Sequence, residues 1–137
     1  PIHPRTKKKM QLSKLFNELR NNKLIKIIDP IGYIDFMCLQ MNARIVLTDS
    51  GGIQEESTFF GIPCITVREN TERPITISKG TNRLIGTNYD GIPGEITSTI
   101  RDNSNKHSIP SLWDGKSSER ISKILESHFY KTNKNYF

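Results

Sequence analysis

Apolar residues recur along this chain at two spacings, one typical of helices and the other of short buried strands. Over residues 6–21 they return every three or four positions, which predicts an amphipathic helix that ends at Asn21 and Asn22. The same spacing predicts further helices over about residues 32–41, 53–60, 91–103 and 116–130. Gly61 and Pro63 come directly after the helix predicted to end at residue 60, as expected of a helix end.

Short runs of β-branched and aliphatic residues lie between these segments and predict strands. The runs cover residues 24–28, 45–47, 64–67 and 84–85, and residues 1–4 look like the end of a further strand. Because the connections between successive runs are long enough to hold a helix, the strands are expected to be parallel. The alternation predicts an α/β fold, with a Rossmann-like parallel sheet and helices on both of its faces.

The length and the cysteines limit the class of protein. The chain has 137 residues, which is the size of one domain. No apolar run approaches the roughly 18 residues of a membrane span, so we expect no membrane-spanning helix. The two cysteines, Cys38 and Cys64, lie in apolar runs and lack the spacing of a metal or redox pair. We therefore expect reduced core cysteines and a cytoplasmic protein.

The net charge of +6 is concentrated at one end of the chain. Residues 1–26 hold eight Lys or Arg side chains and one Glu, a balance of +7, so the remaining chain carries −1. A basic block can bind nucleic acid, but no recognised nucleic-acid motif follows this one, and we expect no such partner. The block is interpreted as a solvated helix face or as a basic rim beside a small anionic ligand.

Candidate chemistry lies where the predicted strands end, because ligands bind at the carboxyl ends of the strands in an open parallel sheet. There the string Asp49-Ser50-Gly51-Gly52 joins a strand to a helix. The first N–H groups of a helix have no internal partner, and with the helix dipole they attract anions. The string is compatible with a phosphate site, to which Ser50 adds a hydroxyl, and equally with an ordinary turn.

Charged residues beside this turn also have two interpretations. Glu55 and Glu56 lie near the start of the helix, where a carboxylate either complements the dipole or accepts bonds from ribose hydroxyls. Adjacent helical positions point about 100° apart, so at most one of the two faces a ligand. In the loop over residues 69–74, Arg73 is suited either to a diphosphate or to a structural ion pair.

Two longer motifs and four short ones carry a resemblance to one enzyme family. DSGGIQEE occupies residues 49–56 and TERP occupies residues 71–74. The short stretches are His3-Pro4-Arg5-Thr6, Tyr33-Ile34-Asp35-Phe36, Gly80-Thr81-Asn82-Arg83-Leu84 and Asp114-Gly115-Lys116. In this order and at this spacing the chain resembles the non-hydrolysing UDP-N-acetylglucosamine 2-epimerases from residue 1 to about residue 126.

The resemblance implies a two-lobed fold of the glycosyltransferase-B type. Residues 1–126 would form its C-terminal, nucleotide-binding lobe, residues 127–137 would be a frayed polar tail, and the N-terminal lobe would be absent. The implied reaction interconverts UDP-GlcNAc and UDP-ManNAc by elimination and re-addition of UDP, without a cofactor. The implied partners are UDP or UDP-GlcNAc and the missing lobe, with a homodimer as the full-length enzyme. This chain alone would be inactive.

The resemblance also implies roles for single residues in UDP binding. Ser50, Gly51 and Gly52 would hold the diphosphate, and Glu56 would hold the ribose. Arg73 would reach the phosphates of the departing UDP, and stabilising that charge would contribute to the rate as well as to binding.

Other residues are assigned more distant roles or none. By the resemblance, Phe36 would line the uracil pocket, and His3 with Arg5 would lie near a regulatory or secondary substrate site. The resemblance assigns no catalytic residue to this chain. His107 and His128 have no companion at metal-ligand spacing, and the sequence contains no metal-ligand cluster.

Two other functions stay open. The same architecture serves UDP-sugar glycosyltransferases, many of which carry a Glu in a comparable helix. The chain could also be a truncated, non-catalytic nucleotide-binding remnant. Consumption of an acceptor sugar would indicate the first, and a natural start codon just before Pro1 would indicate the second.

Overall fold

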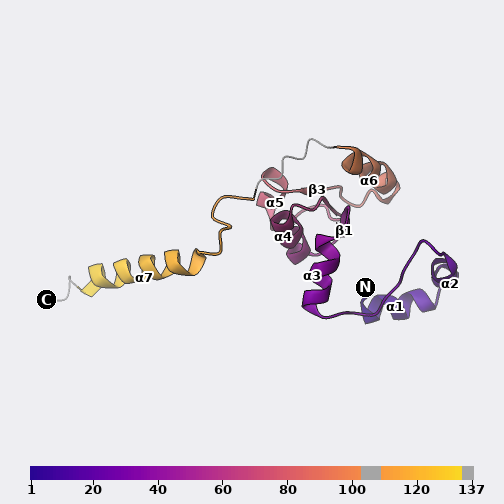
Figure 1. The fold of residues 1–137 in the computed structure, drawn as a ribbon, viewed down its shortest axis with the longest axis horizontal. Coiled ribbons are helices and arrows are strands. Elements are labelled where there is room, and N and C mark those ends of the chain that lie inside the picture. The colour runs from indigo at the N-terminus through magenta and orange to yellow at the C-terminus, as the bar shows by residue number, and fades with distance from the viewer. Residues whose placement is uncertain (103–108, 134–137) are drawn as a thin grey trace. The chain divides into compact units, whose positions relative to one another are not determined.

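The computed structural model describes residues 1–102 and 109–133 (Figure 1). The chain forms two compact units, Pro1–Leu39 and Gln40–Phe137, and each is described by itself. His107, the last residue of the helix predicted over 91–103 and the end of the predicted polar tail lie outside the described residues.

The first unit contains two helices where the sequence predicted one. Helix α1 covers Pro4–Gln11 and α2 covers Lys14–Asn21, so the prediction of a continuous helix over residues 6–21 is wrong. Ser13 is extended between them, with φ −112° and ψ 150°, and its hydroxyl donates to the Met10 carbonyl at 2.9 Å. Serine favours the position directly before a helix, and here Ser13 precedes α2 while its hydroxyl binds a carbonyl of α1.

The predicted strand over residues 24–28 is also absent from the described structure. Residues 22–32 have no regular secondary structure beyond a turn, and a single backbone bond, from Ile2 N–H to the Ile28 carbonyl at 2.9 Å, joins this segment to residues 1–4. The first four residues form no strand either, because Pro4 already begins α1. An apolar run becomes a strand only when a neighbouring strand supplies a ladder, and Leu24 is 95% exposed.

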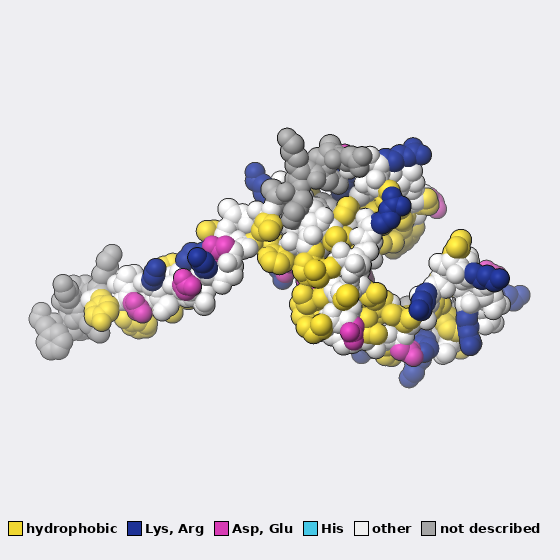
Figure 2. Space-filling model, in the orientation of Figure 1, with side chains coloured by type: hydrophobic (Ala, Val, Ile, Leu, Met, Phe, Trp, Pro, Cys, Tyr) yellow, Lys and Arg dark blue, Asp and Glu magenta, His cyan; other side chains and the backbone are white. Residues whose placement is uncertain are grey.

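Lys and Arg side chains crowd the surface of α1 and α2 (Figure 2). Of the eight basic residues in the first 26, only Lys7 is not exposed, and it forms an ion pair with Asp29. This exposure agrees with a solvated basic face. Helix α3, Tyr33–Met41, lies where a helix over 32–41 was predicted.

The second unit is built on a three-stranded parallel sheet in the order β1-β2-β3. The strands are β1, Val46–Thr48; β2, Cys64–Thr66; and β3, Asn82–Leu84. Val46 pairs with Cys64, and Cys64 pairs with Asn82. The parallel sheet and all three strand positions confirm the sequence prediction to within about two residues.

The connections between strands are helical. Helix α4, Gly51–Phe60, joins β1 to β2 and ends at Gly61, whose φ of 73° is the left-handed conformation that favours glycine. Helix α5, Pro74–Ser78, joins β2 to β3 and was not predicted, because five residues are too few for a helical period to be recognised. After β3 come a 3₁₀ turn, Tyr89–Gly91, then α6, Ile92–Arg101, and α7, Ser117–Asn133.

Helices cover both faces of the sheet, as predicted. Successive side chains of a strand point to opposite faces. On one face Asn82 donates to Gln54 of α4 and to Thr76 of α5, both at 3.2 Å. On the other face Arg83 forms an ion pair with Asp102, at the end of α6, at 2.6 Å. No helix in the described part of the chain has the length and apolarity to cross a membrane.

The core of the second unit is centred on β2, where Cys64, Ile65 and Thr66 are all fully buried. Burial raises the pKa of the Cys64 thiol. Cys38 is exposed, so the expectation of a core position is confirmed for Cys64 and wrong for Cys38. Neither forms a disulfide bond.

Candidate functional site

The carboxyl end of β1 leads into the amino end of α4, where the sequence predicted a phosphate site. Ser50 is the residue before the helix, with extended backbone angles and no side-chain capping bond. The helix begins at Gly51, two residues before its predicted start, so Gly51 and Gly52 form its first turn. The N–H groups of a first turn have no acceptor within the helix and can donate to an anion.

The two glycines have different surroundings. A Cβ on Gly52 would meet no atom within 4 Å, so its backbone faces open space that a ligand can enter. A Cβ on Gly51 would lie 3.0 Å from Oε1 of Glu72. The Glu72 carboxylate therefore lies against the amino end of α4, and a side chain at residue 51 would have to displace it.

Glu72 is held in its ionised form. Its own backbone N–H, and then the charge of Arg68, lower the pKa of the Glu72 carboxyl. Arg68 Nη1 lies 3.2 Å from Glu72 Oε2 in an exposed ion pair. A negative charge beside the positive end of a helix is favourable, and this one lies next to the place where the sequence predicts a bound anion.

Arg73 lies next to α4, as its predicted role requires. Its Nε lies 3.0 Å from Oε1 of Glu55, and both side chains are about two-fifths exposed. The contact is an ion pair without an aligned hydrogen bond. Nη1 approaches the Glu72 carbonyl at 3.5 Å, which is a weak contact, so the guanidinium keeps donors that a phosphate could use.

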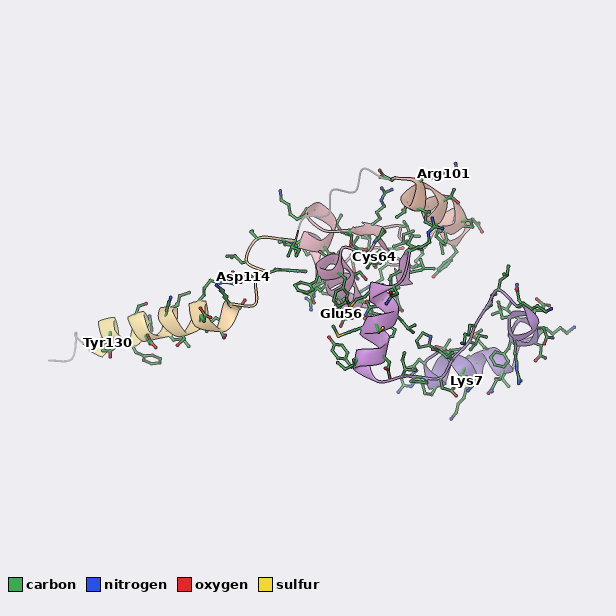
Figure 3. The ribbon with its side chains drawn as sticks, in the orientation of Figure 1. Lys7, Glu56, Cys64, Arg101, Asp114 and Tyr130 are labelled. Carbon is green, nitrogen blue, oxygen red and sulfur yellow. The ribbon has the colours of Figure 1, made fainter. Side chains whose placement is uncertain are left out.

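Glu55 and Glu56 point to different partners, as expected of adjacent helical positions. Glu55 faces Arg73, whereas Glu56, labelled in Figure 3, accepts a hydrogen bond from Gln40 Nε2 at 2.6 Å through its Oε2. Gln40 is only 3% exposed, so it fixes the carboxylate of Glu56 from the protein side. Glu56 itself is half-buried and retains oxygen lone pairs for further donors.

The remaining predicted site residues lie in the first unit. Phe36 is half-buried in α3. His3 precedes α1, and its Nδ1 accepts the Arg5 N–H at 3.2 Å, which is a helix-capping contact. The structure therefore brings together Ser50, the two glycines, Glu56 and Arg73 in one unit. Within the described residues, no group of three or more His, Cys, Asp or Glu side chains could hold a metal ion.

Sequence reasoning missed the amide side chains that support this site. Gln40 and Gln54 lie inside predicted helices, yet both are nearly inaccessible to solvent. The sequence does contain one indication of them, a long polar residue at a core-facing position of a helix. Such a residue needs a specific hydrogen-bond partner when it is buried.

An anion at this place could accept bonds from the first-turn N–H groups of α4 and from the Ser50 hydroxyl, and the Arg73 guanidinium contacts the same helix at Glu55. A carboxylate, Glu56, lies about one turn further along the same helix. Donors for phosphate beside an acceptor for hydroxyl groups suit a nucleotide.

Comparisons with known proteins agree with this chemistry. A family model described as UDP-N-acetylglucosamine 2-epimerase matches residues 1–126. The chain is 46% identical over 124 residues to a protein of Methanocaldococcus jannaschii with that name, covering 90% of this chain and 33% of the relative. It is 32% identical over 132 residues to the protein of that name from Escherichia coli K12, covering 93% of this chain and 34% of the relative.

Solved structures give the same result. The crystal structure of the Methanocaldococcus jannaschii UDP-GlcNAc 2-epimerase in complex with UDP-GlcNAc and UDP matches with a TM-score of 0.77 and 45% identity. The match covers 92% of this chain and 34% of that chain. The chain thus spans about a third of the length of the curated relatives it matches. Those enzymes have a glycosyltransferase-B fold, and the likeness confirms the predicted fold class.

Proposed function

The chain belongs to the UDP-N-acetylglucosamine 2-epimerase family, and from that membership we propose that it is the UDP-binding, C-terminal portion of an enzyme that interconverts UDP-GlcNAc and UDP-ManNAc. The observation that carries the proposal is the contact of Arg73 with α4, in which its Nε lies 3.0 Å from Oε1 of Glu55 on the helix whose first turn holds Gly51 and Gly52. A relative with 45% identity to this chain was solved in complex with UDP-GlcNAc and UDP, which supports the same ligand class here.

In the proposed complex the diphosphate accepts bonds from the Gly51 and Gly52 N–H groups and from the Ser50 hydroxyl. The Arg73 guanidinium binds the same phosphates from the side of α5. Glu56 accepts bonds from the two ribose hydroxyls, and Gln40 keeps that carboxylate in position at 2.6 Å. Phe36 is proposed to line the uracil pocket, and His3 and Arg5 to belong to a secondary substrate site.

The proposed reaction needs this site in both of its half-steps. A base removes the C2 proton, the C1–O bond breaks, and both electrons of that bond leave with UDP, which leaves an unsaturated 2-acetamidoglucal. Re-addition returns a proton to the opposite face of C2 and rejoins UDP at C1. The negative charge that develops on UDP falls on the helix terminus and on Arg73, so these groups stabilise the transition state electrostatically.

The groups that act on C2 are proposed to lie in the other lobe of a two-lobed enzyme, which would be a homodimer. This chain alone would then bind UDP without turnover. Neither cysteine forms a disulfide bond, which agrees with a reducing compartment, and we propose the cytoplasm.

The test is calorimetric titration of the chain with UDP. We expect Glu56→Ala and Arg73→Ala each to weaken UDP binding by about tenfold or more, since each removes a bond to a charged group. His128→Ala, in α7, serves as the control and should bind UDP like the wild type. Unchanged affinity in Glu56→Ala would contradict the ribose assignment. Epimerisation of UDP-GlcNAc by the chain alone would contradict the division between two lobes.

A further inference from the structure

A buried amide, Gln54, lies in the helix that begins at the candidate diphosphate site. It belongs to α4, is fully buried, and takes part in two hydrogen bonds through its Oε1. The Thr71 hydroxyl donates to this oxygen at 2.6 Å, and Asn82 Nδ2 donates to it at 3.2 Å. Asn82 is 3% exposed, and its Nδ2 also donates to the Thr76 hydroxyl at 3.2 Å.

Thr71 and Thr76 bind the backbone of Arg73, one at its N–H group and the other at its carbonyl. The Arg73 N–H donates to Thr71 Oγ1 at 3.0 Å, and the Thr76 hydroxyl donates to the Arg73 carbonyl at 2.7 Å. Both polar groups of the Arg73 backbone are therefore bound to hydroxyls, and each hydroxyl is bound in turn by a buried amide side chain.

The donors and acceptors of this network are mutually consistent. Thr71 accepts the Arg73 N–H and donates its one hydrogen to Gln54. Asn82 presents its NH₂ group to Gln54, and its Oδ1 accepts from the Thr66 hydroxyl at 2.7 Å. The oxygen of the Gln54 amide thus faces Thr71 and Asn82. Its Nε2 has no hydrogen-bond partner among the described residues.

Helix α4 thus contacts Arg73 at two points, its backbone and its guanidinium. Gln54 reaches the Arg73 backbone through Thr71, and the next residue, Glu55, pairs with the Arg73 guanidinium at 3.0 Å. Both contacts arise in the same turn of the helix whose first N–H groups form the anion site. We propose that Gln54 is a positioning residue, which fixes Arg73 relative to the amino end of α4 and so preorganises the diphosphate site before the nucleotide binds.

This inference rests on the proposed function, because it needs UDP as the ligand that both parts of the site share. A purely structural Gln54 would predict something different. Its loss would then weaken UDP binding through general loosening, to the same extent whether or not the Arg73 guanidinium is present. A positioning Gln54 acts only through Arg73, so its loss has no effect once that guanidinium is gone.

A double-mutant cycle separates the two roles. UDP affinity is measured by calorimetry for the wild type, Gln54→Met, Arg73→Ala and the double variant, each shown to be folded by circular dichroism. Thr71→Val, made alone and together with Arg73→Ala, removes the linking hydroxyl at a half-buried residue, and Thr71→Ser keeps it. Lys123→Ala, on the exposed surface of α7, is the control.

We expect Gln54→Met and Thr71→Val to weaken UDP binding about tenfold in the wild-type background, the effect of a lost hydrogen bond to a fixed group. In the Arg73→Ala background neither should weaken it further, and Thr71→Ser should bind UDP like the wild type. Equal losses in both backgrounds would overturn the inference, and so would a Thr71→Ser variant as weak as Thr71→Val.

A second measurement decides the inference even if the chain fails to bind UDP, a result that would refute the proposed function. Hydrogen exchange of the Arg73 amide, which donates to Thr71, is followed by NMR. In Gln54→Met it should become at least about tenfold faster. The Cys64 amide, which donates to the Thr81 carbonyl at 3.1 Å, should be unaffected. No change at Arg73, or equal acceleration at both amides, would overturn the positioning role.

Discussion

Replacing Gly80 with alanine tests how tightly α4 and α5 approach each other beside β3. A Cβ at this residue would lie 2.5 Å from both Cγ2 and Oγ1 of Thr58 and 2.5 Å from the carbonyl oxygen of Thr76. Nonbonded heavy atoms reach their optimum at about 3.5–4.0 Å, so each neighbour has to retreat by roughly 1 Å. Thr58 and Thr76 are both fully buried, and the Thr76 oxygen belongs to the backbone of α5.

Overpacking of this kind costs about 1–3 kcal/mol, and we expect the upper half of that range because backbone has to move. With a urea dependence of about 1–3 kcal/mol per molar, the midpoint of urea unfolding should fall by roughly 1 M. Circular dichroism during a urea titration measures this shift. UDP affinity should fall as well, since α5 begins directly after Arg73.

Gly94→Ala is the matched control for this substitution. It lies inside α6, where an added Cβ would meet nothing within 4 Å. Alanine should therefore stabilise the protein by about 0.5–1 kcal/mol through its helix propensity. A midpoint for Gly80→Ala equal to or above that of the wild type would refute the close approach of Thr58 and Thr76 to Gly80.

Two further predictions concern charged groups. The hydrogen bond from Arg120 lowers the pKa of Asp114 from 3.8 to about 2, so the contribution of this ion pair to stability is complete above pH 3.8 and is lost as the pH falls towards 2. NMR titration should show a midpoint near that value, and Arg120→Met should move it back towards 3.8; an ordinary midpoint in the wild type would contradict the pair. Glu72→Gln removes an ionised carboxylate from the amino end of α4, so UDP affinity measured by calorimetry should rise by about two- to fivefold. The increase should be smaller at high salt, because salt screens exposed charges. Weaker binding by Glu72→Gln would show that the carboxylate supports the site instead.

The sequence predicts those parts of the fold that depend on local pattern. The strands at Val46–Thr48 and Cys64–Thr66 follow from β-branched runs between turn residues, and the strand at Asn82–Leu84 overlaps the run predicted at residues 84–85. Gly61 ends α4 as expected. The apolar run at residues 24–28 looks the same in sequence and forms no strand. Whether such a run forms a strand depends on its pairing with another segment, and the residues of the run do not encode that pairing.

The candidate site also contains residues that the sequence identifies and residues that it does not. Ser50, the two glycines and Arg73 could be identified because their motifs lie at the ends of predicted strands. Gln54 could not, because its partners are 17 and 28 residues away along the chain, in a loop and in another strand. A buried network of this kind is defined only by the packing that brings its members together.

The pairing of the strands has a consequence for how the protein folds. Val46 pairs with Cys64, which lies eighteen residues later in the sequence, and Cys64 pairs with Asn82, which lies eighteen residues later again. Because the entropy lost on closing a loop depends on its length, both β-α-β connections cost nearly the same and neither requires a distant partner. We expect residues 46–84 to fold as one cooperative unit, with the slowest hydrogen exchange of the chain at Cys64–Thr66; faster exchange there than in α6 would contradict this. Ser50, Glu56 and Arg73 all lie inside that segment, so the proposed diphosphate and ribose contacts would form together when it folds, whereas Phe36, the proposed uracil contact, lies outside it.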